Sequence, residues 1–319
     1  MKRVVERFWF FVGIAAAFAL AFRFPEWGGR VREARIVPVG VFLTFVITGA
    51  TLDFGDLIRR GQHLRALVGA TVSTLIVLPI TIRALAGGVF RDQPDFLVGA
   101  TLIAAAPVTV ASGTIMTAMA LGNVALSLSI CVATNLACLL TMPALLPALL
   151  RMEQPIHLPA GQILSGLALT VVLPTLLGAA LRKWIRPWLG GWTRPFSQSV
   201  VLLIIFNAAA SSVARIRGAE IAALALLGFT VVLRFAIVGY HWLLSRALRL
   251  DGPSRAAFTI HASQKTLVVS SLVWGWHFAE RFPMALLPGI AYHLVQMVMD
   301  TLVARGFRRA AIARGAQSG

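Results

Sequence analysis

Charged residues are scarce in this chain of 319 residues, and acidic residues are the scarcest. Aspartate and glutamate together number 12, charged residues make up 13% of the sequence, and hydrophobic residues make up 58%. The apolar runs reach about 20 residues, the length of a helix that crosses a membrane. Strands of a membrane barrel would instead alternate apolar and polar residues over about ten positions. The sequence therefore predicts an all-α membrane protein.

Cysteine and catalytic motifs are also nearly absent. The two cysteines, Cys131 and Cys138, lie seven residues apart in one predicted helix. They are separated by roughly 10 Å along its axis, so they cannot form a disulfide with each other. The chain has no HExxH motif and no pair of acidic residues within any one predicted span. We predict no enzymatic activity and no cofactor, and an intramembrane enzyme is the weakest alternative.

Lysine is the rarest basic residue. It accounts for three of the 29 basic positions, at Lys2, Lys183 and Lys265, and arginine accounts for the other 26. Lys265 lies in the apolar run Ala256–Trp276, where inserting an ionisable side chain costs about 2.5–3.5 kcal/mol. Lysine, unlike arginine, can lose its proton on burial, so Lys265 is a candidate functional residue. The alternative is that its side chain extends to the membrane surface.

Ten apolar segments are long enough to span a membrane. Their arginines cluster in short loops, which is the positive-inside pattern and not a nucleic-acid-binding face. Placing both termini in the cytoplasm puts 17 basic residues inside and 10 outside, so we expect a multi-pass protein of the bacterial inner membrane with that orientation. Residues 8–22 resemble a signal peptide, but we interpret them as part of the first span. The predicted spans are 8–24, 36–52, 66–88, 95–120, 123–149, 160–181, 197–214, 219–244, 254–279 and 283–304.

Polar residues interrupt the fourth and ninth predicted spans. The fourth contains Pro107 followed by Ser112 and Gly113, and the ninth contains His261–Thr266. Proline removes a donor from the helix and glycine adds flexibility. Because the interruptions occupy corresponding places in the two halves of the chain, we predict ten transmembrane helices in two inverted five-helix repeats, with broken helices 4 and 9 that cross at mid-membrane. Two unrelated kinks are the alternative.

The segment Pro107–Pro147, in which Gly122–Ser127 follows the broken helix, and the segment Ser263–Leu267 carry a family resemblance. They resemble the bile acid:sodium symporter superfamily, and specifically its SBF-like subgroup. The resemblance covers essentially the whole chain and implies one transporter domain, residues 1–319. It implies a bile acid sodium symporter-like fold, in which the solute binds beside the crossing of helices 4 and 9, between a panel (8–24, 36–52, 160–181 and 197–214) and a core (66–149 and 219–304).

The resemblance also implies where sodium would bind. Sodium-coupled members hold two ions with polar residues on helices 4, 5 and 9. These positions and their neighbours fall here on Ser112, Gly113, Thr114, Ser127, Cys131, His261, Ser263, Gln264 and Lys265.

An ammonium thus stands at one of the ion-binding positions, and we expect no acidic residue near the crossing. We therefore predict that the two sodium sites are not both intact and that the Lys265 ammonium takes the place of one ion. Ser127 and Asn135 remain candidate sodium ligands. The hydroxyls of Thr109, Ser112 and Thr114 either contact a ligand or bond to carbonyls of their own helices.

Two further polar residues are candidate substrate contacts. Asn207 lies in the seventh span, on the panel side, and Arg234 lies in the middle of the eighth. Arg234 alternatively binds backbone carbonyls, extends to the surface, or pairs with Asp300 near the end of the tenth span.

The leading functional hypothesis is a secondary transporter of a small organic solute that works by alternating access. We expect an anion, because Lys265, Arg234 and His261 supply positive groups to the membrane interior without matching acids. Sodium coupling follows from the resemblance, whereas proton coupling follows from Lys265. The expected partners are the lipid bilayer and the solute, with no nucleic acid. A receptor or regulatory membrane protein without transport is the alternative.

Overall fold

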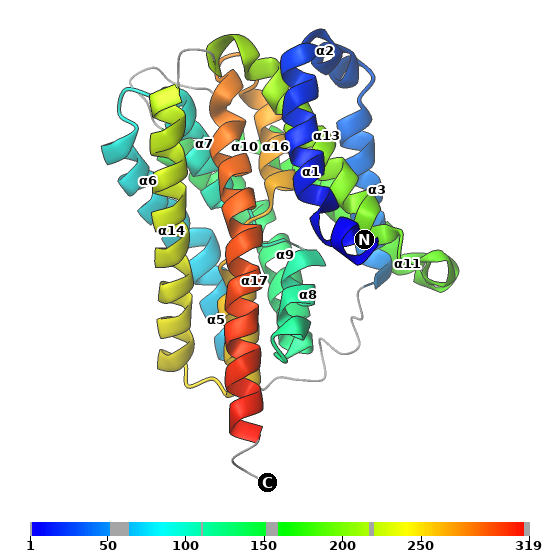
Figure 1. Cartoon of the computed structure of the whole chain (residues 1–319), viewed down its shortest axis with the longest axis vertical. Helices are drawn as coiled ribbons and strands as arrows, with labels where there is room; N and C mark the ends of the chain where they lie inside the picture. The colour runs from blue at the N-terminus through cyan, green and yellow to red at the C-terminus, as the bar shows by residue number, and fades with distance from the viewer. Residues whose placement is uncertain (1, 52–63, 110, 151–158, 217–219, 316–319) are drawn as a thin grey trace.

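A computed structural model of the protein describes residues 2–51, 64–109, 111–150, 159–216 and 220–315, and within these ranges all regular structure is helical (Figure 1). Most helices run along the long axis of an elongated bundle, and the last helix ends at its lower tip (Figure 1). The elements are α1 (Lys2–Arg23), α2 (Glu26–Glu33), α3 (Ile36–Thr51), α5 (Leu64–Val72), the π-helix η2 (Ser73–Val77), α6 (Leu78–Val89), α7 (Pro94–Ala105), α8 (Ala111–Met119), α9 (Val124–Leu149), α10 (Ala160–Leu167), the π-helix η3 (Ala168–Val172), α11 (Leu173–Ala180), α12 (Arg182–Ile185), the short 3-10 helix η4 (Arg186–Trp188), α13 (Thr193–Ile216), α14 (Glu220–Ala247), α15 (Gly252–Ala262), α16 (Leu267–His277), the 3-10 helix η5 (Pro283–Leu286) and α17 (Leu287–Gly315).

Length and composition identify the segments that can cross a membrane. Large apolar side chains are exposed on their outer faces, for example Leu140 at 70% and Val232 at 69%, as expected where lipid surrounds the protein. The protein is therefore an integral, multi-pass membrane protein, as predicted. Among the described residues, six helical segments are long and apolar enough: Leu64–Val89, Val124–Leu149, Ala160–Ala180, Pro195–Val213, Ile221–Ala247 and Pro283–Ala313. The apolar helices Val12–Arg23, Ile36–Thr51 and Pro94–Ala105 are shorter.

The fourth and ninth predicted spans are each divided into two short helices. Helices α7 and α8 contain 12 and 9 residues, and α15 and α16 contain 11 each. Helix α7 stops because Ala106 is extended (φ −66°, ψ 151°) and Pro107 supplies no N–H. Helix α16 starts after Thr266, whose hydroxyl accepts a hydrogen bond from Val268 N. The prediction that both helices are broken is confirmed, except that Gly113 lies inside α8 and not in the break.

Two groups of helices pack mainly among themselves. Helices α1, α3, α11 and α13 form one group, and α5, α6, α7, α9, α14, α15 and α17 form the other. Helices α3 and α11 approach closely because each contributes a glycine. A Cβ on Gly49 would lie 1.9 Å from Thr175 O, and one on Gly178 would lie 1.9 Å from Val46 O. Small residues permit this backbone contact, which is a common way for helices to pack in membranes.

Candidate functional site

The breaks in the two divided helices touch each other. Thr266 N donates a hydrogen bond to Pro107 O at 2.9 Å. The ring nitrogen Nε2 of His261 lies 2.8 Å from Thr109 O, although the two residues are 152 positions apart in the sequence. Both carbonyls belong to the segment between α7 and α8, where the missing helical turns leave main-chain oxygens without helical partners. The breaks therefore bring their unpaired main-chain groups to one place.

The side chain of Lys265 ends in a cluster of backbone carbonyls. Its Nζ donates to Thr74 O and Ala104 O, both at 2.6 Å, and to Ala106 O at 3.0 Å. The residue is fully buried, and its own main-chain N–H donates to Gln296 Oε1 at 2.8 Å. The ammonium therefore uses all three of its protons inside the protein and does not extend to the membrane surface.

Local helix defects supply the carbonyls that hold this ammonium. In the π-helix η2, Leu78 N bonds to Ser73 O, so the next bond of that pattern would join residue 79 to Thr74 O. Residue 79 is Pro79, which has no N–H, and Thr74 O is therefore left for Lys265. The oxygens of residues 104 and 106 are free because α7 ends there. The carbonyl end of a helix carries partial negative charge, which favours a cation at this position.

The imidazole of His261 is held between the fifth span and the break in the fourth. Its Nδ1 lies 2.5 Å from Ser127 Oγ and its Nε2 lies 2.8 Å from Thr109 O. Because a carbonyl only accepts, Nε2 carries the proton and Nδ1 accepts from Ser127. Gly113 makes room for the ring, since a Cβ there would lie 2.4 Å from His261 Cδ2. The hydrogen bond from Ser127 Oγ thus gives His261 Nδ1 a donor and the Ser127 proton an acceptor.

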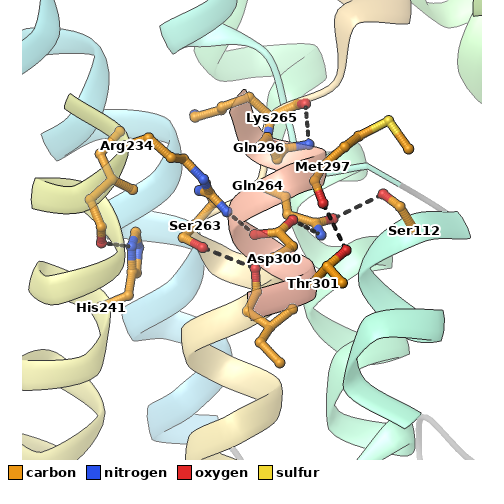
Figure 2. A network of polar contacts seen from close by, with 12 residues as sticks. Ser112, Arg234, His241, Ser263, Gln264, Lys265, Gln296, Met297, Asp300 and Thr301 are labelled. Carbon is orange, nitrogen blue, oxygen red and sulfur yellow. Dashed lines mark hydrogen bonds and ion pairs between the residues drawn. The ribbon is translucent and has the colours of Figure 1, made fainter. Parts of the chain in front are cut away.

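Gln264 links the break to a carboxylate. Its Nε2 donates to Asp300 Oδ2 at 2.5 Å, and its Oε1 accepts from Ser112 Oγ at 3.3 Å (Figure 2). The same Oε1 also accepts from Thr109 Oγ1. The prediction that no acidic residue lies near the crossing is therefore wrong. Asp300 is sequentially remote, at the end of the last predicted span, and α17 carries it to the break by packing against α15.

Arg234 neutralises Asp300. Its guanidinium forms an ion pair with Asp300 Oδ1 and donates to Ser263 O, and Tyr292 OH donates to the same carbonyl at 2.9 Å. The sequence offered pairing with Asp300 as one alternative for Arg234, and this pairing is confirmed. Arg234 therefore has a matching acid, and the expectation that it has none is wrong. Because the Arg234 side chain is 0% exposed, it does not present a free charge to a solute.

A cavity of about 130 Å³ lies next to the two breaks. Its walls come from both helix groups, and none of the described residues that form them carries a full charge. Of the predicted site residues, Ser112 borders this cavity, whereas Lys265, Arg234 and Asn207 do not. The lining residues are Phe10, Thr44, Phe45, Thr48, Thr109, Ser112, Ile115, Met116, Ser197, Gln198, Val201, Thr266, Leu267, Val268, His293 and Met297.

The remaining predicted positions lie around the breaks without converging on one point. Asn135 Nδ2 donates to Cys131 O at 2.9 Å, and both residues border a second, smaller cavity of about 70 Å³. Thr114 lies in α8, half-buried. Asn207 is buried in α13, and its Oδ1 has no partner among the described residues. No group of three or more His, Cys, Asp or Glu side chains suited to a metal occurs in the described parts of the chain.

Two residues of α17, Tyr292 and Gln296, were missed, and so was the contact of Asp300 with the break, although the spacing of the three residues gave a signal. Tyr292, Gln296 and Asp300 recur every fourth position and so share one face of the helix. That face meets the ninth-span break: Tyr292 and Gln296 bind the main chain of Ser263 and Lys265, and Asp300 binds Gln264. A polar stripe in an otherwise apolar span indicates a face turned toward the protein interior.

Two divided helices in contact, a buried ammonium at their meeting point and a cavity beside them are typical of a transporter. The sequence model of the SBF-like CPA transporter family matches residues 8–309. The chain belongs to this family. Membership places it among transporters and not among enzymes, as predicted.

Similarity to known proteins extends over most of the chain. It is 26% identical over 284 residues to the uncharacterized protein PA2026 of Pseudomonas aeruginosa, which covers 86% of this chain and 84% of that protein. It is 24% identical over 321 residues to the probable sodium/metabolite cotransporter BASS4, chloroplastic, of Oryza sativa subsp. indica, covering 93% of this chain and 75% of the relative. It is 23% identical over 310 residues to the sodium/bile acid cotransporter 7 of Xenopus tropicalis, covering 92% and 90%. The resemblance to bile acid:sodium symporters is thereby confirmed.

Proposed function

We propose that the chain is a secondary transporter that carries a small organic anion across a lipid bilayer by alternating access. The proposed architecture has ten spans in two inverted five-helix repeats, with α7–α8 and α15–α16 crossing at the middle of the bilayer. The six long apolar segments, helices α1 and α3, and the two divided spans supply the ten segments. Paired interrupted helices at corresponding places in two halves are the usual mark of a transporter's binding site.

The observation that carries this proposal is the cavity between the two helix groups. We assign α1, α3, α10, α11 and α13 to a panel and the other long helices to a core. The panel contributes Phe10 and Val201 to the cavity, and the core contributes Thr109, Leu267 and Met297. Because the two groups pack mainly within themselves, moving one against the other would open the cavity first to one side of the membrane and then to the other.

The cavity favours a small anionic solute. A buried apolar cavity of about 150 Å³ holds benzene, so the 130 Å³ found here suits a solute of about that size in this conformation. Among the residues that the structure describes, no acidic residue lines it. The first residues of α16, Leu267 and Val268, border it together with Thr266. The N-terminus of a helix favours negative charge. The organic solutes in the relatives' names, a metabolite and a bile acid, are compatible with this class.

We further propose that the Lys265 ammonium takes the place of one coupling sodium ion. Its three carbonyl partners form the kind of oxygen cage that would otherwise suit a cation. A sodium ion at about 4 Å from it would be repelled by roughly 4 kcal/mol at an effective dielectric of 20. Loss of the ammonium proton would leave at least one carbonyl without a donor, which links the protonation state to the packing of the break. Protons are therefore the proposed coupling ion.

The alternative is coupling to sodium, since two of the relatives are called sodium cotransporters. In that case Ser127 and Asn135 would hold sodium with other oxygens. Ser127 Oγ donates to the His261 ring at 2.5 Å and accepts from Thr117 Oγ1 at 3.1 Å, so only one of its two lone pairs is left for an ion, which argues against it. Asn135 Oδ1, which has no partner in the described parts of the chain, is the atom that favours it.

We propose an inner-membrane location with both termini in the cytoplasm, supported by the 17:10 distribution of basic residues. Of these, Arg59, Arg60, Arg151 and Arg217 lie outside the described residues. Reporter fusions at Gly319 and in the loop of residues 150–159 should label opposite sides of the membrane.

Flux into proteoliposomes tests the whole proposal. Uptake of small organic anions should be driven by an inward proton gradient and should be unchanged by a sodium gradient at fixed pH. Strong dependence on sodium would refute proton coupling and leave transport intact. Uptake of cations alone would refute the solute class, and the absence of flux for every solute would favour the receptor alternative.

A further inference from the structure

A chain of hydrogen bonds connects the buried ion pair to the wall of the cavity. Asp300 Oδ2 accepts from Gln264 Nε2 at 2.5 Å, and Gln264 Oε1 accepts from Thr109 Oγ1 and Ser112 Oγ. Figure 2 shows this connection running from Ser112 through Gln264 and Asp300 to Arg234. Thr109 and Ser112 both line the cavity. The carboxylate is therefore two hydrogen bonds away from the hydroxyl groups that line the cavity.

Asp300 fixes the orientation of the Gln264 side-chain amide. The carboxylate is paired with Arg234, which keeps its proton in proteins, so Asp300 is ionised and can only accept hydrogen bonds. The amide atom that faces it must be the nitrogen. The reversed amide would set two oxygens against each other in a buried site, and an unpaired buried acceptor is costly. The amide oxygen is thus turned toward Thr109 and Ser112.

This orientation determines where the hydroxyl protons go. Each hydroxyl has one proton to donate, and Thr109 donates its proton to Gln264 Oε1. Ser112 Oγ lies 2.7 Å from Thr109 Oγ1 and 3.3 Å from Gln264 Oε1, so it finds its acceptor within the same cluster. Both hydroxyls then present lone pairs, and no proton, to the cavity.

The opposite wall offers a second acceptor. Gln198 of α13 lines the same cavity, and its Oε1 is buried and accepts no hydrogen bond from any residue that the structure describes. A buried oxygen without a donor costs free energy. A solute that donates hydrogen bonds would satisfy acceptors on the core side and on the panel side at once.

We infer that Asp300, acting through Gln264, makes this wall of the cavity accept hydrogen bonds, so that the recognised solute carries a donor such as a hydroxyl group. The inference rests on the proposed transport function and narrows its solute to hydroxylated organic anions. The hydroxyl group contacts Thr109 and Ser112, and the anionic group faces the first turn of α16. Asp300 and Gln264 are positioning residues, since neither touches the solute.

Matched anions that differ by one hydroxyl group test this. The probes are benzenesulfonate with its 3-hydroxy and 4-hydroxy derivatives, which stay charged and do not leak through lipid, and butyrate with 3-hydroxybutyrate. Proteoliposomes of the full chain should take up at least one hydroxylated anion with a half-saturating concentration about tenfold below that of its parent anion. A tenfold difference in affinity corresponds to the net free energy of about one hydrogen bond. Thr109→Val and Gln264→Met should each reduce this ratio toward one, and Thr109→Ser should restore it.

Thr101→Val is the matched control. Thr101 is a buried threonine of α7 whose hydroxyl donates to Leu97 O of its own helix at 2.8 Å, so its loss should leave the ratio unchanged. If the wild type takes up both members of every pair equally, or prefers the parents, or if the preference survives Gln264→Met and Thr109→Val, the inference is overturned while transport stands. If no probe is taken up above empty liposomes, the proposed function fails and the inference fails with it.

Discussion

The ammonium of Lys265 donates a hydrogen bond to the main-chain oxygen of Thr74, which lies 191 residues earlier in the sequence. The same nitrogen binds two carbonyls at the end of α7. One side chain therefore ties together the third span, the first half of the fourth and the break in the ninth. A group that holds three segments at once is well placed to link its own protonation to their relative movement.

Replacing Lys265 should affect both stability and coupling. Lys265→Met leaves the three carbonyls without donors, and each unsatisfied buried group costs about 1–3 kcal/mol. We expect a large fall in the melting temperature of the purified protein and loss of the response of uptake to a proton gradient. Lys265→Gln restores part of the hydrogen bonding and should cost less. Lys183→Met, at an exposed position, is the control, and an equal effect of this control would contradict the prediction.

The Arg234–Asp300 pair should behave as a unit. Asp300→Asn leaves a buried guanidinium without its counter-ion, and breaking a buried pair costs about 3–5 kcal/mol. Arg234→Met leaves the carboxylate unpaired at a similar cost. The double variant removes both charges and should be more stable than either single variant. Thermal unfolding in detergent measures all three, with Asp92→Asn at an exposed site as control; additive losses in the double variant would show that the two residues act independently.

The sequence predicted the helical membrane class and the two broken spans because both are local properties. A long run of apolar residues defines a span. Pro107 and the polar segment His261–Thr266 each interrupt a span whatever the rest of the chain packs against it. Lys265 and His261, which the sequence singled out as candidate site residues, both lie where the breaks meet, and their roles in binding stay predictions.

The partners of those residues could not be predicted in the same way. Thr74 contributes a main-chain oxygen, which leaves no signal in its side chain, and Asp300 reaches Gln264 only through the packing of α17. The cavity depends on both helix groups, so Gln198 and His293 were not identified as lining residues. Long-range packing, and not local propensity, decides these contacts.

Gly113 should tolerate no side chain. A Cβ there would lie 2.4 Å from the ring of His261, and the ring cannot move away without breaking its bonds to Ser127 and Thr109. Gly113→Ala should therefore destabilise the protein by about 1–3 kcal/mol, as overpacking usually does, and should slow uptake. Gly161→Ala is the matched control, because nothing lies within 4 Å of its added Cβ. A stable, fully active Gly113→Ala variant would show that the ring is not held as described.

Pro79 should matter through the hydrogen bond that it cannot make. In η2, a residue with an N–H at position 79 could bond to Thr74 O and so satisfy it from the main chain. In the Lys265→Met background, where Thr74 O has lost its donor, Pro79→Ala should raise stability by about 1 kcal/mol. In the wild-type background the oxygen already accepts from Lys265, and the same substitution should bring no such gain.

Pro174 provides the matched control for this comparison. It follows the second π-helix, η3, in the same way that Pro79 follows η2, with Leu173 N bonded to Ala168 O. None of the oxygens of η3 accepts a hydrogen bond from Lys265. Pro174→Ala should therefore change the melting temperature equally in the wild type and in Lys265→Met. A gain from Pro79→Ala that is the same in both backgrounds would mean that removing a proline, and not satisfying Thr74 O, stabilises the helix.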